Sequence, residues 1–438
     1  MGLGKGNKFG GTEGLNSRLA ALELLAGVLR EDRPLEEAAE ANKLFLALTV
    51  RDKAFAWLLV LSCLRHLGEI DALINGCLKR PLSKKAYRVT DLLRLGLTQI
   101  LFVGTPDYAA VNSTVNLAEG GLAGYRRLIN AVLRRVVREG RERLETLDRA
   151  YLNTPKWLWE SWVKEYGLKN TRHIAEMHGK EPPLDITAKQ AGMMEGVLEG
   201  RRLLSSSIRL HTEKSVGEIE GYQDGAWWVQ DVAATLPVKM LGKIGGEAVI
   251  DLCAAPGGKT AQLCDAGAKV FSVDISSRRL KILKENLDRL SFSSNVICAD
   301  IRRWRPEHPV NFVLLDAPCT GTGTIRRHPD ILHRRTRDQV VRSAQLLDEL
   351  LVNAAAMVRV GGTLVFSTCS LQPQEGPDRV DLFLASNPGF VRVPLGKEFG
   401  SEIGVYTTEA GYLRTLPCCL AELGGMDGFF AARLKRAF

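Results

Sequence analysis

The sequence predicts a multidomain protein with an all-α N-terminal domain, a small α/β connecting module and a doubly wound α/β domain. Its 438 residues are too many for one ordinary domain. Apolar residues recur every three or four positions through the first part of the chain, as they do in amphipathic helices. Later, short β-rich runs alternate with helical stretches, which is typical of a parallel sheet covered by helices. The predicted domains are residues 14–149, 150–224 and 225–438.

Composition excludes several classes of protein. Apolar residues make up 45% of the chain and charged residues 25%, the balance of a globular protein with a substantial core. The longest nearly unbroken apolar run, 54–64, is far shorter than the roughly 20 residues that a bilayer span needs, and the Gly-rich start lacks the apolar core of a secretion signal. Nine cysteines without CxxC pairs indicate reduced thiols in a cytoplasmic protein, and the scattered histidines predict no metal site.

The positive charge is unevenly distributed. Lysine and arginine outnumber aspartate and glutamate by 59 to 50 in the whole chain, and by 28 to 20 in its first 180 residues. A localised positive field favours a polyanionic partner such as nucleic acid. The densest basic run contains Arg126, Arg127, Arg134, Arg135, Arg138, Arg141 and Arg143. On a helix several of these could neutralise phosphates, but Glu139 and Glu142 partly offset them, so an ordinary solvated face is the alternative.

The elements follow from the local pattern. In the first domain, Pro34, Pro81 and Pro106 mark loops between helices. The connecting module begins with a Trp-rich helix and continues with short extended segments. Trp227 and Trp228, at the entry to the third domain, are expected in a core. The predicted strands of the third domain are 247–253, 269–274, 295–300, 310–316 and 362–368, with a further strand near the C-terminus and helices at 277–290 and 336–358.

The first of these strands continues into DLCAAPGGKT, residues 251–260. A strand, a tight Pro-Gly-Gly turn and a helix are typical of a nucleotide-cofactor loop, in which Gly257 and Gly258 let the backbone approach a ligand. A Walker A loop would need glycine at Cys253, and a dinucleotide fingerprint would need Gly-x-Gly-x-x-Gly, so neither pattern fits.

Acidic residues end the next three strands, namely Asp274, Asp300 and Asp316. A carboxylate after the second strand suits two vicinal ribose hydroxyls, and one after the third could accept a hydrogen bond from an adenine amino group. A ligand with adenosine but no phosphate fits this pattern, and that ligand is S-adenosylmethionine. The alternative is that these aspartates merely cap the helices that follow.

Two cysteines are expected at the same edge of the sheet. The fourth strand ends in LLDAPCTGTGT and the fifth in FSTCSLQPQEG, which place Cys319 and Cys369 there. A thiolate is suited to conjugate addition: attack on carbon 6 of a pyrimidine converts carbon 5 into an enamine carbon that can take a methyl group. The alternative is a role as small core residues, which is the role expected of Cys63, Cys77, Cys253, Cys264 and Cys298.

The motifs DLCAAPGGKT, LLDAPCTGTG and FSTCSLQPQEG resemble the successive signatures of the RNA 5-methylcytosine methyltransferases of the Sun/Fmu family. The N-terminal part, with RDKAFAWLLVLSCLRHLGEIDALI and LINAVLRR, resembles a NusB-like domain. Together they imply a NusB-like helical domain, a small RNA-binding subdomain and a Rossmann-like class I methyltransferase domain. The implied protein is a cytoplasmic, S-adenosylmethionine-dependent enzyme that forms 5-methylcytosine in 16S ribosomal RNA, and we expect a monomer without a metal.

The resemblance also implies roles for individual residues. Cys369 is the nucleophile on carbon 6, Cys319 helps to release the product, and Asp316 hydrogen-bonds the N3 and amino edge of the cytosine beside the cofactor. The cofactor is expected on Cys253, Ala254, Ala255, Pro256, Gly257, Gly258 and Lys259, with Asp274 at the ribose, Asp300 near the adenine and Lys259 directed towards the base. One departure is LDITAK at residues 184–189, where the family often has a Trp-Ile-Arg-Val-Asn-like stretch, so no RNA contact is implied for that segment.

Two other functions stay open at the level of sequence. One keeps the chemistry but changes the substrate to transfer RNA or another ribosomal RNA site. The other is a non-catalytic RNA-binding or ribosome-assembly factor, which would have no need for two thiols at one edge of the sheet.

Overall fold

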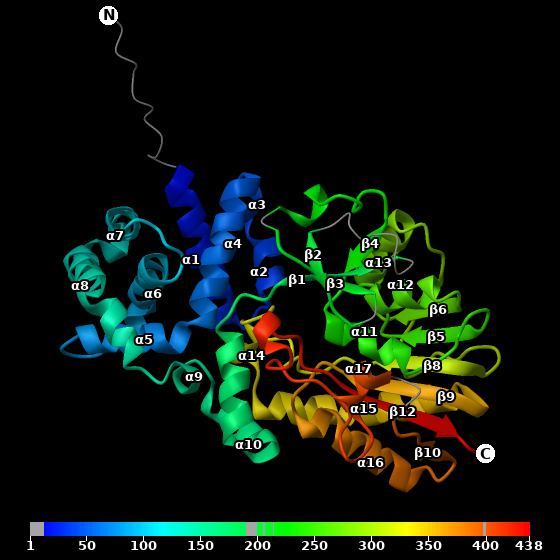
Figure 1. The fold of residues 1–438 in the computed structure, drawn as a ribbon. Coiled ribbons are helices and arrows are strands. Elements are labelled where there is room, and N and C mark those ends of the chain that lie inside the picture. The colour runs from blue at the N-terminus through cyan, green and yellow to red at the C-terminus, as the bar shows by residue number, and fades with distance from the viewer. Residues whose placement is uncertain (1–12, 190–198, 205, 213, 397–399) are drawn as a thin grey trace, which may run out of the picture. The chain divides into compact units, whose positions relative to one another are not determined.

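The computed structural model describes residues 13–189, 199–204, 206–212, 214–396 and 400–438, which form two compact units (Figure 1). The first unit contains the chain up to Gly179 together with His328–Arg335, and the second contains Lys180–Arg327 and Thr336–Phe438. The three domains expected from the sequence stay a prediction, since the compact units divide the chain at other residues.

The first unit is helical, as predicted. Its helices are α1 (Glu13–Glu31), α2 (Leu35–Ala41), α3 (Lys43–Ala47), α4 (Val50–Arg65), α5 (Leu67–Cys77), α6 (Tyr87–Leu101), α7 (Asp107–Asn116), α8 (Arg126–Glu145), α9 (Arg149–Leu152), α10 (Lys156–His178) and α14 (Ile331–Arg334). The apolar faces of helices α1 to α8 contribute to one core that includes Leu25, Leu59 and Leu92. Helices α6 and α8 approach closely at Gly96, where a Cβ atom would lie 2.6 Å from Leu133 Cδ2.

The segment His328–Arg335, which contains α14, packs into this helical unit although it is far away in the sequence. Ile331 and Leu332 are buried, and the His333 ring lies 2.7 Å from the Leu64 carbonyl oxygen through Nε2. Burial lowers the pKa of His333, so the neutral ring donates its Nε2 proton to that carbonyl.

The second unit contains two sheets. The smaller has the order β2-β3-β1-β4 and is built from β1 (Leu184–Ala188), β2 (Gly200–Arg202), β3 (Ser207–Leu210) and β4 (Trp227–Val229). The larger has the order β10-β12-β9-β8-β5-β6-β7, with β11 beside β12. Its strands are β5 (Ala248–Leu252), β6 (Lys269–Asp274), β7 (Asn295–Cys298), β8 (Val310–Asp316), β9 (Val358–Thr368), β10 (Phe390–Arg392), β11 (Leu413–Arg414) and β12 (Phe430–Arg436).

The predicted parallel sheet is correct for β5 to β9 and wrong for the C-terminal strands. β12 pairs antiparallel with β9, and β10 pairs antiparallel with β12, so the sheet is mixed. These strands follow the last β-α-β unit, and antiparallel pairing needs no helical crossover. The helices of this unit are α11 (Val232–Lys239), α12 (Gly258–Asp265), α13 (Ser277–Arg289), α15 (Arg337–Ala356), α16 (Pro377–Ser386) and α17 (Gly400–Gly404).

Burial bears out the prediction for the adjacent tryptophans, since Trp227 and Trp228 both lie in the core. In the described part of the chain, no helix combines the length and the apolar character needed to cross a membrane.

Candidate active site

The loop after β5 has a conformation that requires glycine at one position. Gly257 has φ 107°, in the left-handed region, and a Cβ atom there would lie 3.0 Å from Leu283 Cγ. At Gly258 the nearest atoms to such a Cβ are 3.8 Å away, so this glycine leaves space without a strained backbone. The loop is tied to β6, because Ala254 N donates to Val273 O at 3.1 Å.

Asp251 and Thr260 lie beneath this loop. Asp251 is fully buried, and Thr260 Oγ1 donates to its Oδ2 at 2.6 Å. Its other oxygen, Oδ1, is buried without a hydrogen-bond partner among the described residues. Burial raises the pKa of Asp251 to about 7, and the negative charges of Asp316 and Asp274 act in the same direction.

Asp274 and Asp300 end neighbouring strands, as the sequence predicts. Asp274 is buried and accepts hydrogen bonds from Ala255 N at 3.2 Å and Ser276 N at 2.9 Å. The capping alternative therefore holds in part, and the Arg279 guanidinium also lies 3.7 Å from Asp274 Oδ2. Two backbone hydrogen bonds still leave a carboxylate with further acceptor capacity, since it has about four acceptor positions. Asp300 pairs with the Arg302 guanidinium at 2.7 Å, and that hydrogen bonding holds the pKa of Asp300 below its ordinary value.

The residues at this sheet edge fit a positively charged cofactor. Burial raises the pKa of the Cys253 thiol, and the nearby Asp274, Asp316 and Asp251 raise it further, so the acidic residues gather around this loop. S-adenosylmethionine carries a sulfonium and an ammonium group, so both its charge and its ribose suit residues 253–259 and Asp274. The unpartnered Asp251 oxygen adds a buried polar group beneath the same loop.

Lys259 and Asp316 form an ion pair at the next strand end. Lys259 Nζ lies 2.7 Å from Asp316 Oδ2, and Ser367 Oγ donates to Asp316 Oδ1 at 2.9 Å. Asp316 on β8 and Ser367 on β9 are direct neighbours in the sheet register. Lys259 is nearly buried, whereas the Asp316 side chain is 30% exposed, so the carboxylate of the pair is the group that a substrate can reach.

The structure brings the two predicted cysteines together. Cys319 Sγ and Cys369 Sγ lie 3.5 Å apart, within hydrogen-bond distance for sulfur. The hydrogen bond to Cys369 raises the pKa of Cys319 well above its ordinary value, and burial and the nearby charges of Cys369 and Glu375 raise it further. Cys319 therefore keeps its proton and lies within reach to donate a hydrogen bond to the Cys369 sulfur.

Glu375 connects the two cysteine loops and was not predicted as a site residue from the sequence. It is fully buried, accepts a hydrogen bond from Thr320 N at 2.8 Å, and accepts others from the hydroxyls of Thr320 and Ser370. Thr320 follows Cys319 and Ser370 follows Cys369 in the chain, so one carboxylate fixes the backbone beside each sulfur. Its place inside the FSTCSLQPQEG motif was the one available signal.

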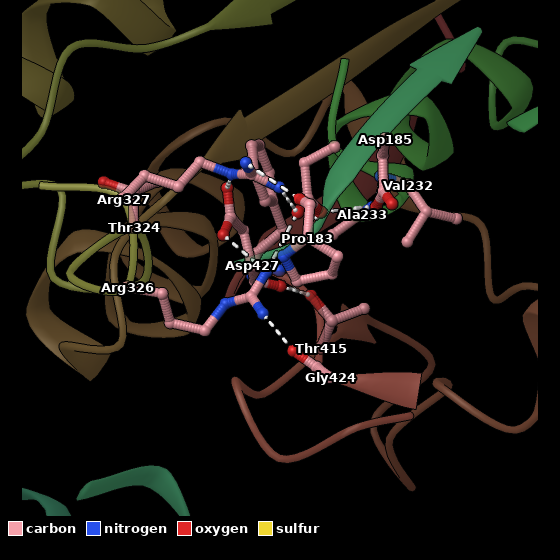
Figure 2. A network of polar contacts seen from close by, with 12 residues as sticks. Pro183, Asp185, Val232, Ala233, Thr324, Arg326, Arg327, Thr415, Gly424 and Asp427 are labelled. Atoms are coloured by element: carbon pink, nitrogen blue, oxygen red, sulfur yellow. Dashed lines mark hydrogen bonds and ion pairs between the residues drawn. The ribbon is translucent and has the colours of Figure 1, made fainter. Parts of the chain in front are cut away.

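A buried ionic network lies further along the Cys319 loop, and Figure 2 shows how Arg326 and Arg327 both reach towards Asp427. Arg326 also lies 3.1 Å and Arg327 2.6 Å from Asp231, the residue that caps α11. Burial alone would raise the pKa of Asp231, but the two arginines hold it below its ordinary value. The network ties the loop to α11 and to the segment before β12.

The remaining cysteines differ in how deeply they are buried. Cys63 is buried, which confirms the core prediction, but the prediction is wrong for Cys298, which is exposed at the end of the edge strand β7. Cys77, Cys253 and Cys264 are only partly buried. Among the described residues no group of three His, Cys, Asp or Glu side chains is arranged to hold a metal ion.

Comparison with known proteins agrees with both units. The family model described as 16S rRNA methyltransferase RsmB/F matches residues 238–435, and the NusB family model matches residues 15–138. The chain is similar to ribosomal RNA small subunit methyltransferase B of Pseudomonas putida, with 32% identity over 96% of this chain and 98% of the relative. The protein of the same name from Shigella sonnei is 36% identical over 88% and 90% of the two chains.

Solved structures show the same fold. The crystal structure of PH0851 superposes with a TM-score of 0.72 at 22% identity and covers 98% of this chain and 100% of its own. The structure of NSun6 from Pyrococcus horikoshii with SFG has a TM-score of 0.55 at 18% identity, over 65% of this chain and 98% of its own.

Proposed function

The chain belongs to the RsmB/F family of S-adenosylmethionine-dependent 16S rRNA methyltransferases, and we propose that it methylates carbon 5 of a cytosine through a covalent adduct with Cys369. The substrate we propose is 16S ribosomal RNA, the RNA named for the family. We further propose that the enzyme acts in the cytoplasm as a monomer.

The observation that carries the proposal is the 3.5 Å separation of the Cys319 and Cys369 sulfur atoms beside the Lys259–Asp316 ion pair. An enzyme that methylates an exocyclic amine needs no thiol nucleophile. A carbon 5 methyltransferase needs one, because carbon 5 of cytosine becomes nucleophilic only after addition at carbon 6.

The ion pair positions the cytosine. Asp316, as a carboxylate, accepts a hydrogen bond from the exocyclic amino group at the N3 edge of the base. Attack at carbon 6 pushes negative charge onto the N3 and O2 side of the ring, and the Lys259 ammonium stabilises that charge. Because Ser367 holds the other Asp316 oxygen, the carboxylate is oriented before substrate binds.

The two thiols then act in sequence. The Cys369 thiolate forms a bond to carbon 6, and the electron pair of the 5,6 double bond moves to carbon 5. When bound, S-adenosylmethionine supplies a methyl group on a positively charged sulfur, which carbon 5 accepts. A general base then takes the carbon 5 proton, and the electron pair of that bond re-forms the 5,6 double bond. The bond from carbon 6 to Cys369 breaks, and Cys369 leaves as a thiolate. The Cys319 thiol donates its hydrogen bond to the departing Cys369 sulfur and so assists release.

Trapping the adduct tests this order of events. The Cys319→Ala protein is incubated with unmodified 16S RNA and S-adenosylmethionine and analysed on a denaturing protein gel. We expect a retarded protein–RNA band that is absent from the Cys319→Ala/Cys369→Ala protein. Cys298→Ala is the matched control, because this thiol is exposed and distant from the other two in sequence, and it should give turnover without a band.

Two results would contradict the proposal. Wild-type methylation rates in Cys369→Ala would exclude Cys369 as the nucleophile. Nucleoside analysis that finds the methyl group on an exocyclic nitrogen would exclude methylation at carbon 5. Transfer to total RNA but not to 16S RNA would keep the chemistry and replace the substrate.

A further inference from the structure

Helices α7 and α8 of the first unit carry charged groups that the proposed chemistry does not use. The seven arginines of α8 separate into two sets in the structure. Arg135 and Arg143 both pair with Glu139, at 3.0 and 2.9 Å, and Arg126 lies 3.8 Å from Glu119. Two carboxylates therefore compensate most of the positive charge of these three arginines.

The other set forms what we call the arginine stripe: Arg127, Arg134, Arg138 and Arg141. All four are exposed, and within the described part of the chain none has a carboxylate in ion-pair distance. Their spacings of seven, four and three residues place them along one face of α8. At about 1.5 Å of rise per residue the stripe is about 21 Å long.

A groove of about 640 Å³ lies beside the stripe, between α7 and α8. Tyr108 on its rim is 79% exposed, a large fraction for an aromatic side chain. The apolar part of the lining is Val111, Val115 and Val137, and the polar part is Asp107, Asn112, Asn130, Arg134 and Arg138. The groove therefore combines an apolar wall, an exposed ring, two amides and two guanidinium groups.

This combination suits a nucleotide better than an apolar peptide. A base can stack on an aromatic ring or a guanidinium plane while amides bond its edge, and phosphates pair with arginines. Asp107 repels a phosphate, so it directs the sugar–phosphate chain towards the stripe and can accept a hydrogen bond from a base amino group. A base in a duplex is not available for such stacking, so the occupant is unpaired.

We propose that the α7–α8 surface binds an unpaired nucleotide of the RNA substrate, with the base in the groove beside Tyr108 and the flanking phosphates along the arginine stripe. The proposal rests on RNA being the substrate, as proposed above. It gives the helical unit a role in holding the RNA, apart from the residues that carry out methylation.

The test compares two double variants of the full chain. Arg134→Gln/Arg138→Gln removes two charges from the stripe, and Arg135→Gln/Arg143→Gln removes two charges that share an ion pair with Glu139. Affinity for protein-free, unmodified 16S RNA is measured by filter binding at several salt concentrations, without S-adenosylmethionine. We expect the stripe variant to bind about 10-fold more weakly, with a salt slope lower by about one to two, and the control variant to stay within about twofold of wild type.

The second part of the test uses variants of Tyr108. Tyr108→Ala should weaken binding about 10-fold and Tyr108→Phe should bind as wild type does, because the ring and not the hydroxyl stacks. With saturating RNA all four variants should keep the wild-type kcat, so the loss appears in KM. Thermal unfolding of each variant verifies that it is folded.

The outcomes separate this inference from the proposed function, because binding is measured without methyl transfer. Weak binding by the stripe variant supports the surface even if the methylation assay fails. If the two double variants bind RNA equally well while methylation is intact, the proposed RNA-binding surface is wrong, and a protein ligand becomes the candidate for the groove. Wild-type binding by Tyr108→Ala overturns the placement of a base.

Discussion

The Cys319 and Cys369 sulfur atoms lie 3.5 Å apart, and the carboxylate of Glu375 holds the residue that follows each of them. The separation is short enough for a hydrogen bond between the sulfurs, and the pKa of Cys319 is raised well above its ordinary value, so its thiol keeps its proton. Two identical functional groups thereby acquire different roles.

The pH–rate profile should reflect this difference. Because the pKa of Cys319 is raised above 9.0, its thiol stays protonated across pH 7 to 9, and product release should not decline in that range. Single-turnover release, measured by loss of the protein–RNA adduct, checks this. A decline between pH 7 and 9 that disappears in Cys319→Ser would show that Cys319 titrates within the range, contrary to expectation.

Glu375→Gln should lower kcat by about 10- to 100-fold with little effect on KM, because misplacement of reacting groups by about 1 Å can cost that much. The glutamine amide would place an N–H group against the donors of Thr320 and Ser370. It would also remove a charge that raises the pKa of Cys319. The rate of product release should therefore begin to decline at a lower pH than in wild type. Asp378→Asn, an exposed change nearby, is the control. An unchanged kcat in Glu375→Gln would refute the positioning role.

Asp251 should make stability depend on pH. An unfolded aspartate loses its proton near pH 4, whereas folded Asp251 holds its proton to about pH 7. The folded state therefore binds more protons in that interval, and the free energy of unfolding falls as pH rises from about 4 to 7, by up to ~4 kcal/mol.

Asp251→Asn removes this titration and keeps an oxygen for the Thr260 hydroxyl. Urea denaturation at pH 5 and pH 8 should show the variant gaining stability relative to wild type at the higher pH. The exposed Asp288→Asn should show no such trend. The same stability difference at both pH values for Asp251→Asn would mean that the carboxyl does not titrate in this interval.

Arg326→Met should lower the free energy of unfolding by about 3–5 kcal/mol, because it leaves buried carboxylates without one of their two cations. Arg326 is fully buried and contacts both Asp231 and Asp427. Urea denaturation measures the loss, with the exposed Arg342→Met on α15 as the control. Similar stabilities of the two variants would show that Arg327 alone compensates both carboxylates.

Much of the fold could be predicted because it is recorded in local patterns. The predicted strands 269–274 and 310–316 coincide with β6 and β8, since buried parallel strands are continuous apolar runs. The strand near the C-terminus was predicted and is β12, but its antiparallel direction was not, because the direction of a strand depends on the path of the chain and not on its own residues. β9 also begins earlier than expected, at Val358.

The site residues, like the fold, could be predicted from the sequence only in part. Strand ends gave the positions of Asp274, Asp316 and both cysteines, whose approach follows from the register of adjacent strands. Glu375 and Arg326 could not be predicted, since their importance depends on partners up to 101 residues away. Nor could the sequence tell which arginines of α8 are compensated, because Glu139 is equally near several of them along the chain.

The placement of His328–Arg335 limits how this molecule can be dissected. A shortened chain that starts after Gly179 would retain this segment but lose its packing partners, including the Leu64 carbonyl that bonds His333. Ile331 and Leu332 would then face water. The N-terminal helical part is thus not a detachable module. A gene fusion that first joined it to the rest of the chain would have required changes in the internal segment His328–Arg335 as well as at the junction.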